Sequence, residues 1–317
     1  MKILFMGTPD FALEILKNIY DSGEEVIGVV CQPDKPKGRG HKTTPPPTKV
    51  WAEEKDIPVF QPQTMKDEAF LPTLKELDPD MIVVVAYGKI LPHYIIDYPR
   101  FGCINAHGSL LPKYRGAAPM QRAIMDGEKV TGVCAMYMDD GLDTGDMIFT
   151  EKVEITVDDN FETLHDKMAA AGAKVILKTI ECAKSGEIIP REKQCDEGAT
   201  YAAKITKEDR IIDFSLGALE IHNKIRGLSP FPKAFTFMPD GNMLQITASR
   251  VARAESANAA PGTVLSTDAD GFTVACGAGV VRILEVVPAG KGKMSAADFV
   301  RGRKIAVGDV LGAGDDA

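Results

Sequence analysis

The sequence predicts an α/β protein with two domains: a mostly parallel sheet with helices on both faces, followed by a small β-barrel. Apolar runs alternate with helical patterns through the first half of the chain, which is the order that a parallel sheet requires. These runs are apolar on both faces, as in strands that helices cover on each side. Beyond residue 206, short β runs follow one another closely, which is typical of a small barrel.

The first domain, residues 1–188, is built from alternating strands and helices. Expected strands cover residues 2–7, 24–31, 57–62, 81–88, 101–106 and 133–139, and expected helices follow Thr8 and cover about 65–77 and 161–184. Thr8 is the expected N-cap of the first helix, with Pro9 at the first helical position. Asn160 precedes the last helix and Gly186 follows it. This order predicts a Rossmann-like domain.

Residues 189–206 lack clear periodicity, and we expect them to form a linker. The second domain, residues 207–317, begins with a helix over 215–227 that Ser215 caps and Gly227 ends. Five expected strands follow, in the runs AFTFMP, MLQITASRV, GTVLST, GFTVAC and VVRILEVVP. Ser295 begins a last helical turn in an S-x-x-D pattern.

Composition narrows the class of protein. The chain holds 44% apolar residues, and no run approaches the length of a membrane helix. Its six cysteines form no C-x-x-C pair, and its five histidines form no H-E-x-x-H or H-x-H set. We therefore expect a cytoplasmic monomer, with neither a disulfide framework nor a metal, and no association with a membrane.

Basic side chains gather in two places although the net charge is −8. The segment PDKPKGRGHKTTPPPTKV (33–50) contains five cationic side chains and one aspartate. The stretch 204–308 is also net basic. These are the parts of an acidic protein that can bind a nucleic acid.

Three common phosphate or metal motifs are incomplete or absent. The first strand is followed by GTPDFA, which lacks two of the three glycines that a dinucleotide-binding turn needs. No G-x-x-x-x-G-K-[ST] appears anywhere. The acidic stretch MDDGLDTGD (138–146) does not have the spacing of a calcium loop, so most of it is expected to be a solvated turn.

An amide, an imidazole and a carboxylate are expected at one corner of the sheet. Asn105 and His107 come at the end of one strand, and Asp143 comes just after the next. Ligands of open α/β sheets bind outside the carboxyl ends of the strands. The Asn105 amide and a His107 N–H can donate to an oxyanion, while Asp143 orients the imidazole and takes a proton. Such a trio suits acyl transfer to an amine, which itself attacks.

These residues and their neighbours resemble the motifs of a known enzyme family. The run NAHGSLLPKYRG (105–116), followed by GLDTGD (141–146), resembles the formyltransferases that use 10-formyltetrahydrofolate. The resemblance assigns catalysis to Asn105, His107 and Asp143. It also implies a folate pocket lined by Ser109, Leu110, Leu111, Pro112, Ile90, Leu91 and Pro92. The folate is a co-substrate in this family.

Within the family, three features resemble the members that formylate methionyl-tRNA: the start KILFMGTPDFA, the basic loop, and a C-terminal part containing IRGLSPFP (225–232). The resemblance implies an OB-like tRNA-binding domain and tRNA contacts from Lys35, Lys37, Arg39 and Lys42. The implied reaction moves the formyl group to the α-amine of methionyl-initiator-tRNA and releases tetrahydrofolate. It serves the initiation of protein synthesis.

Two other functions stay open from the sequence. The first is formyl transfer to a small amine, such as an amino sugar nucleotide or glycinamide ribotide. The glycinamide enzymes would need neither a second barrel domain nor a basic finger. The second is a non-catalytic RNA-binding relative, which would have no use for an intact Asn/His/Asp trio.

Overall fold

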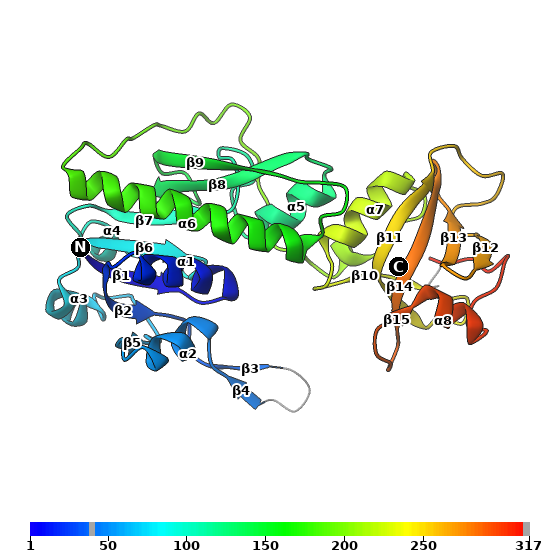
Figure 1. Cartoon of the computed structure of the whole chain (residues 1–317), viewed down its shortest axis with the longest axis horizontal. Coiled ribbons are helices and arrows are strands. Elements are labelled where there is room, and N and C mark those ends of the chain that lie inside the picture. Colours follow the sequence, from blue (N-terminus) through cyan, green and yellow to red (C-terminus); the bar gives the residue numbers. More distant parts are fainter. Residues whose placement is uncertain (38–41, 313–317) are drawn as a thin grey trace. The chain divides into compact units, whose positions relative to one another are not determined.

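A computed structural model describes residues 1–37 and 42–312, which form two compact units (Figure 1). The first unit comprises Met1–Gly116, Val130–Glu154 and His165–Ala202, and the second comprises Ala117–Lys129, Ile155–Leu164 and Ala203–Ala317. The second unit therefore includes two stretches that precede the predicted linker in the chain.

The first unit is built on a seven-stranded sheet in the order β5-β2-β1-β6-β7-β8-β9. Its strands are β1 (Lys2–Gly7), β2 (Glu25–Val30), β5 (Val59–Phe60), β6 (Met81–Val85), β7 (Cys103–His107), β8 (Val130–Tyr137) and β9 (Met147–Glu154). The strands from β5 to β7 pair in parallel, which confirms the mostly parallel sheet. β8 and β9 pair antiparallel, so the expectation of a covered parallel strand at 133–139 is wrong.

Helices cover both faces of this sheet, as predicted. On one face, buried side chains of β1 and β6 pack against α3 (Leu71–Leu77) and α4 (His93–Ile96). On the other, α1 (Asp10–Asp21) contacts β1, and α6 (Phe161–Ser185) approaches α1 closely at Gly172. A Cβ at Gly172 would lie 2.6 Å from the terminal Cδ1 of Ile15, so the glycine lets the two helices approach without displacing that side chain.

Two expected helix starts have different outcomes. Asn160 caps α6 through its Oδ1, which accepts from the backbone N–H of Thr163 at 2.9 Å, as predicted. Thr8 does not cap α1, whose N-cap is Pro9. The Thr8 hydroxyl instead accepts from the backbone N–H of Gln32 at 3.2 Å, because it faces the end of the neighbouring strand β2.

The basic segment is more structured than its sequence suggests. β3 (Lys35–Lys37) and β4 (Lys42–Thr44) pair antiparallel, and α2 (Pro47–Glu54) begins shortly after them. The segment named a basic loop from its sequence therefore contains two short strands and the start of a helix. We call residues 35–44 the basic arm.

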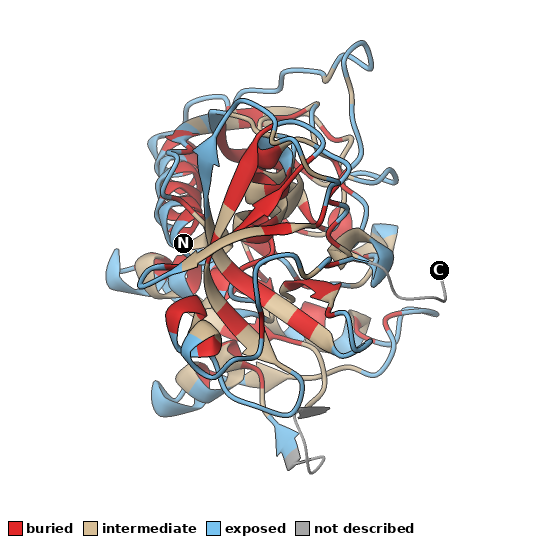
Figure 2. Cartoon of the chain, turned by 90° about the vertical axis from the view of Figure 1, so that its right-hand side faces the viewer, coloured by how far each residue is buried: buried red, intermediate tan, exposed pale blue. Residues whose placement is uncertain are grey.

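The second unit holds an antiparallel sheet in the order β10-β11-β14-β13-β12, with β15 beside β14. Its elements are α5 (Pro119–Met125), η1 (Glu208–Arg210), α7 (Ala218–Gly227), β10 (Ala234–Phe237), β11 (Met243–Arg253), β12 (Val264–Asp268), β13 (Gly271–Ala275), β14 (Val280–Pro288), β15 (Met294–Ser295) and α8 (Ala296–Arg301). The five expected strands are confirmed, and they fit a small barrel-like domain. Buried residues, red in Figure 2, lie along these strands.

The two helix caps expected in this unit, Ser295 and Ser215, have different outcomes. Ser295 caps α8, since its hydroxyl accepts from the backbone N–H of Asp298 at 3.0 Å. Ser215 does not cap α7, because that helix begins three residues later with Gly217 as its N-cap. Glu220 accepts from the Gly217 N–H at 2.9 Å and so satisfies one of the first free donors of the helix.

None of the helices in the described ranges combines the length and the apolar character that a bilayer-spanning segment needs.

Candidate functional site

The site is built on the carboxyl end of β7. Asn105 and His107 are alternate residues of this strand, so their side chains project from the same face. Val84 of the parallel strand β6 pairs with Asn105, and Cys134 of β8 pairs with His107. Asn105 is half-buried and His107 is 6% exposed. The imidazole is therefore buried, and protein groups surround it.

Both nitrogens of the His107 ring face fixed partners. Nδ1 lies 3.5 Å from Oδ2 of Asp143, and Nε2 lies 2.9 Å from the backbone oxygen of Tyr114. Because a carbonyl oxygen can only accept, Nε2 carries a proton and donates it to Tyr114. The backbone N–H of Gly116 donates to the same Asp143 oxygen at 2.8 Å. The predicted histidine and carboxylate are thus brought together.

Asp143 reaches His107 by a route that we did not expect. β8 runs antiparallel to β7, with Tyr137 opposite Ile104, so the carboxyl end of β8 lies toward the start of β7. The expectation that neighbouring strand ends place the carboxylate is therefore wrong. The loop between β8 and β9 turns back instead, and Asp143 adopts a left-handed φ of 55° within it.

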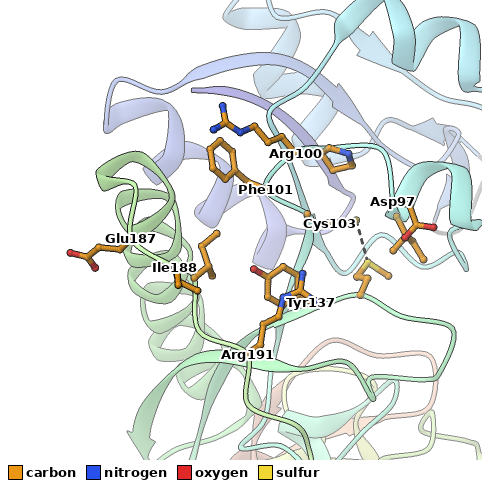
Figure 3. A pocket seen from close by; sticks show the side chains of 13 residues that line it. Asp97, Arg100, Phe101, Cys103, Tyr137, Glu187, Ile188 and Arg191 are labelled. Carbon is orange, nitrogen blue, oxygen red and sulfur yellow. Dashed lines mark hydrogen bonds between the residues drawn. The ribbon is translucent and has the colours of Figure 1, made fainter.

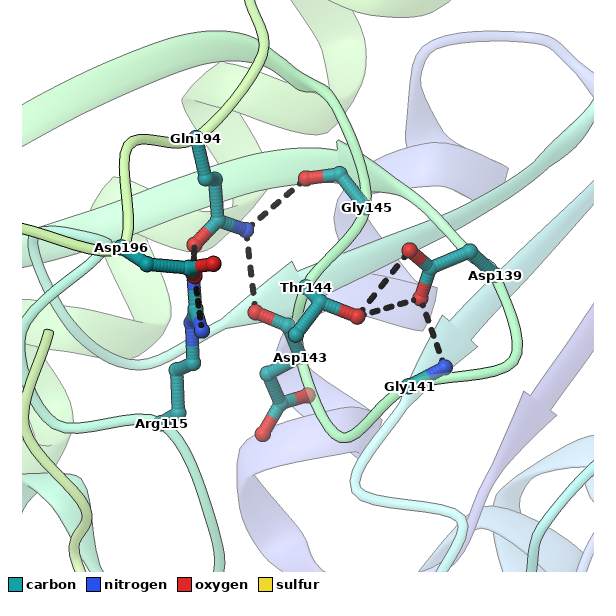
Figure 4. A network of polar contacts seen from close by, with 8 residues as sticks. All are labelled: Arg115, Asp139, Gly141, Asp143, Thr144, Gly145, Gln194 and Asp196. Carbon is teal, nitrogen blue, oxygen red and sulfur yellow. Dashed lines mark hydrogen bonds and ion pairs between the residues drawn. The ribbon is translucent and has the colours of Figure 1, made fainter.

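The loop that carries Asp143 has its own internal contacts. Asp139 Oδ1 accepts from the backbone N–H of Gly141 at 3.1 Å and from the Thr144 hydroxyl at 2.8 Å (Figure 4). Such a turn is closed by a side chain that mimics a backbone group. Most of the acidic run thus shapes a turn, as expected, and Asp143 is the carboxylate that points to the histidine.

The predicted folate loop begins two residues after His107. Ser109 is fully buried, and its hydroxyl donates to the backbone oxygen of Lys113 at 2.6 Å. Leu110 and Pro112 are half-buried. Leu111 packs with Cys134 and Met136, and its peptide bond to Pro112 is cis.

The other predicted folate residues do not share one face. Ile90 is 94% exposed, whereas Leu91 is buried in the core beside Ile95. Pro92 is the N-cap of α4. The loop is tied down by Lys89, whose ammonium group donates to the backbone oxygens of residues 62 and 63.

The predicted tRNA contacts lie in the basic arm. Lys35 is exposed, and Lys37 pairs with Lys42 across the two strands. Arg39 lies outside the described residues. At the base of the arm, Lys49 donates to both carboxylate oxygens of Asp34 at 3.0 Å.

Cys134 pairs with His107 and is the thiol closest to the site in the sheet register. Burial raises the pKa of Cys134 to about 11. The thiolate is therefore not available near neutral pH, and this cysteine is a packing residue. In the described ranges, no group of three or more His, Cys, Asp or Glu side chains could hold a metal ion.

A cavity of about 460 Å³ lies away from these residues, near the start of β7 (Figure 3). Phe101 and Tyr137 form part of its wall, and the Arg191 guanidinium stacks on the Tyr137 ring at 3.8 Å. None of the residues that line it belongs to the predicted site. The hydrogen-bond donors and the carboxylate converge near His107 and not at this cavity, so the His107 region is the candidate site.

Two residues at the site had no predicted role. Arg115 contacts Gln194, which in turn contacts the loop that carries Asp143 (Figure 4). Arg115 falls inside the NAHGSLLPKYRG run, but nothing in its residue type indicates this contact. Gln194 lies in the segment without periodicity, where the sequence contains no signal for it.

The sequence matches known families along most of its length. Residues 1–180 match the family described as Formyl transferase, and residues 204–304 match Formyl transferase, C-terminal domain. A protein named methionyl-tRNA formyltransferase from Caldanaerobacter subterraneus subsp. tengcongensis is 49% identical over 98% of this chain and 100% of its own length. One of the same name from Citrifermentans bemidjiense is 45% identical over 99% of this chain and 98% of its own.

Solved structures share the fold. An N-formyltransferase from Helicobacter canadensis, in complex with folinic acid and dTDP-3-aminofucose, has a TM-score of 0.66 at 19% identity, over 89% of this chain and 99% of its own. HypX from Aquifex aeolicus in complex with tetrahydrofolic acid has a TM-score of 0.64 at 15% identity, over 97% of this chain and 48% of its own.

Proposed function

The chain belongs to the formyl transferase family, and we propose that it transfers the formyl group of 10-formyltetrahydrofolate to the α-amine of methionyl-initiator-tRNA. The observation that carries this proposal is the pairing of His107 with Asp143 at the end of β7. The acceptor follows from full-length relatives named methionyl-tRNA formyltransferase. The products are formylmethionyl-tRNA and tetrahydrofolate, and the reaction serves translation initiation in the cytoplasm.

In the proposed reaction, the methionyl amine attacks the formyl carbon. A new N–C bond forms, and the formyl oxygen becomes an oxyanion. The Asn105 amide and the Nε2–H of His107 donate to this oxyanion. Nε2 donates to the Tyr114 carbonyl at 2.9 Å in the structure, and the proposal requires this proton to be shared with the oxyanion as it forms.

The tetrahedral intermediate then collapses. The bond from the formyl carbon to N10 of the folate breaks, and the electron pair goes to N10. Asp143 takes the proton that the attacking amine loses, directly or through water, and this same proton is delivered to N10 as it leaves, so Asp143 ends the cycle ionised. The step uses no covalent enzyme intermediate, which agrees with the high pKa of Cys134, about 11. It also uses no metal held by the protein.

The remaining residues hold the two substrates. The loops 90–92 and 109–112 would line the folate, and the basic arm would contact phosphates of the tRNA acceptor end through Lys35, Lys37, Arg39 and Lys42. A single chain is sufficient in this proposal, because Asn105, His107 and Asp143 all belong to the first unit.

A formyl-transfer assay tests the acceptor. Transfer from 10-formyltetrahydrofolate to charged initiator tRNA should greatly exceed transfer to charged elongator tRNA, and RNase treatment should abolish it. Turnover of the folate with an amino sugar nucleotide or glycinamide ribotide, and none with the tRNA, would overturn the acceptor. Binding of tRNA without folate turnover would identify a non-catalytic relative.

A further inference from the structure

The segment 192–202, which the sequence predicts to be a linker, lies against the loops around His107. Glu192 exchanges two backbone hydrogen bonds with Met147 at the start of β9, at 2.8 and 2.9 Å. Further along, Arg115 donates its backbone N–H to Thr200 at 2.9 Å and accepts from Ala202 at 2.7 Å. The segment therefore bridges the loop that carries Asp143 and the loop that follows His107.

Gln194 lies between these two loops (Figure 4). Its Nε2 donates to the backbone oxygens of Asp143 at 2.9 Å and Gly145 at 2.8 Å. Its Oε1 accepts from Nε of Arg115 at 3.0 Å and from Nη2 at 2.9 Å. An amide offers two donors and two lone pairs, so all four are used.

These partners also fix which way the amide points. A flipped amide would place its NH₂ group against the Arg115 donors and its oxygen against two carbonyl oxygens. Both contacts would be repulsive. The donors on one side and the acceptors on the other therefore determine the orientation of the amide.

Arg115 is a buried cation, with a side chain only 3% exposed. Its Nη1 donates to Asp196 at 3.1 Å, but that carboxylate is 90% exposed. Burial of a guanidinium is costly unless its donors are used, and here two of them hold Gln194. Arg115 thus holds the oxygen of the Gln194 amide, although two apolar side chains in the same place would cost less free energy to bury.

The same segment reaches the second partner of the histidine. The Thr200 hydroxyl accepts from the backbone N–H of Tyr114 at 2.8 Å. Tyr114 supplies the carbonyl beside Nε2 of His107, and Asp143 supplies the carboxylate beside Nδ1. Both partners of the ring are thus attached to residues 194–200.

We propose that Gln194, oriented by Arg115, is a positioning residue that holds the backbone of Asp143 so that its carboxylate meets His107. This inference rests on the proposed function, because it assigns Gln194 an effect only through Asp143. Catalytic groups need to be held close to their productive geometry, and a displacement of about 1 Å can cost roughly 100-fold in rate.

Gln194→Glu separates the two sides of the amide. The new carboxylate still accepts from Arg115, now as an ion pair, so folding should be retained. Its other oxygen faces the carbonyls of Asp143 and Gly145 and can no longer donate. We expect kcat to fall roughly 10- to 100-fold with KM for the folate changed less than about 2-fold, and the melting temperature to stay near that of the wild type. Gln245→Glu, the same substitution in a half-buried glutamine of β11, is the matched control and should leave kcat unchanged.

A double-mutant cycle distinguishes positioning of Asp143 by Gln194 from a general weakening of the structure. In an Asp143→Ala background, Gln194→Glu should lower the residual kcat no further, because its only route of action is gone. Additive losses would show a structural role and overturn the inference, as would an unchanged kcat in the single variant. If Asp143→Ala itself retained wild-type turnover, the catalytic role of Asp143 and this inference with it would fail, whereas absence of formyl transfer to the tRNA by the wild-type protein would overturn the proposed function, so the failures can be told apart. Gln194→Leu gives a second test if the glutamate variant does not fold.

Discussion

The region around His107 and the basic arm lie in the same unit and are held in opposite ways. Each nitrogen of the His107 ring meets a protein group, and those groups are themselves attached to the segment 192–202. The arm forms a two-stranded sheet of its own, separate from the seven-stranded sheet, and Lys35 in it is exposed. One region is fixed by many polar contacts, and the other exposes Lys35 on a separate two-stranded sheet.

The difference matches what each region is proposed to do. Stabilising an oxyanion requires donors that are already in place when the charge develops. Binding phosphates depends mainly on the number of cations near the nucleic acid and tolerates movement of the side chains. We therefore expect changes near His107 to lower the rate of the chemical step, and changes in the arm to lower the affinity for tRNA.

The largest effect should come from the residues around His107. Asn105→Ala and His107→Ala should each lower kcat by roughly 10²–10³-fold, because each removes a donor to the oxyanion. Asp143→Ala should be at least as damaging, since it removes both the carboxylate beside Nδ1 and the group that takes the proton. Single-turnover formyl transfer with saturating substrates measures these effects.

His165→Ala is a suitable control for this series. His165 lies on α6, where it makes an edge contact with Phe11 and lies 3.1 Å from Asp166, and it has no role in the proposed reaction. It should keep near wild-type turnover. If folded Asn105→Ala and His107→Ala proteins also kept it, the catalytic assignment would be wrong and the contrast with the arm would disappear.

A smaller effect, of a different kind, is expected from the arm. Neutralising Arg39 and Lys42 together should weaken tRNA binding and reduce the slope of log K against log salt by roughly one to two units. Folate binding and the rate at saturating tRNA should change little. Equilibrium binding of tRNA at several salt concentrations measures the slope.

Lys66→Gln with Lys75→Gln removes the same charge from exposed lysines outside the arm. This control should leave the slope almost unchanged. An unchanged slope and unchanged formylation in the Arg39 and Lys42 variant would mean that the arm is a solvated excursion without a role in tRNA binding.

Much of the fold was predictable because burial leaves a pattern in the sequence. The run MIVVV of β6 is wholly buried, and its apolar character on both faces predicts a covered strand. β9 was missed because it lies at an edge, where half-buried Glu151 and exposed Lys152 interrupt the apolar pattern. The direction of β8 was missed as well, since residue type alone does not distinguish a parallel from an antiparallel neighbour.

The site was predictable in part. Asn105 and His107 follow from polar residues at the end of an apolar strand, which is an unusual place for them. Asp143 was found beside His107, although the loop brings it there rather than the strand end. Gln194 could not be predicted, because its role depends on backbone carbonyls that no residue type reveals.

The smallest effect should come from the base of the arm, where three side chains are joined. Lys49 donates to Asp34 at 3.0 Å and to Gln61 at 2.9 Å, and the Gln61 amide donates to Asp34 at 2.7 Å. Lys49→Met should loosen the arm, with the population of open conformers rising roughly two- to five-fold, as expected for a half-exposed ion pair. A fluorophore on Thr43→Cys reports this as lower anisotropy, provided that exposed Cys195 is first replaced by serine.

The pKa of Asp34 determines in which direction the anisotropy should change with pH. Hydrogen bonds from Gln61 and then from Lys49 hold the pKa of Asp34 below its ordinary value. The contacts are therefore complete above that ordinary pKa and are lost only as the pH falls through the lowered one. Wild-type anisotropy should be constant from about pH 8 to about pH 5 and fall at lower pH, while Lys49→Met should start low and show a smaller step. A wild-type step near neutral pH would show that another group anchors the arm, and its contrast with the rigid surroundings of His107 would then need a different cause.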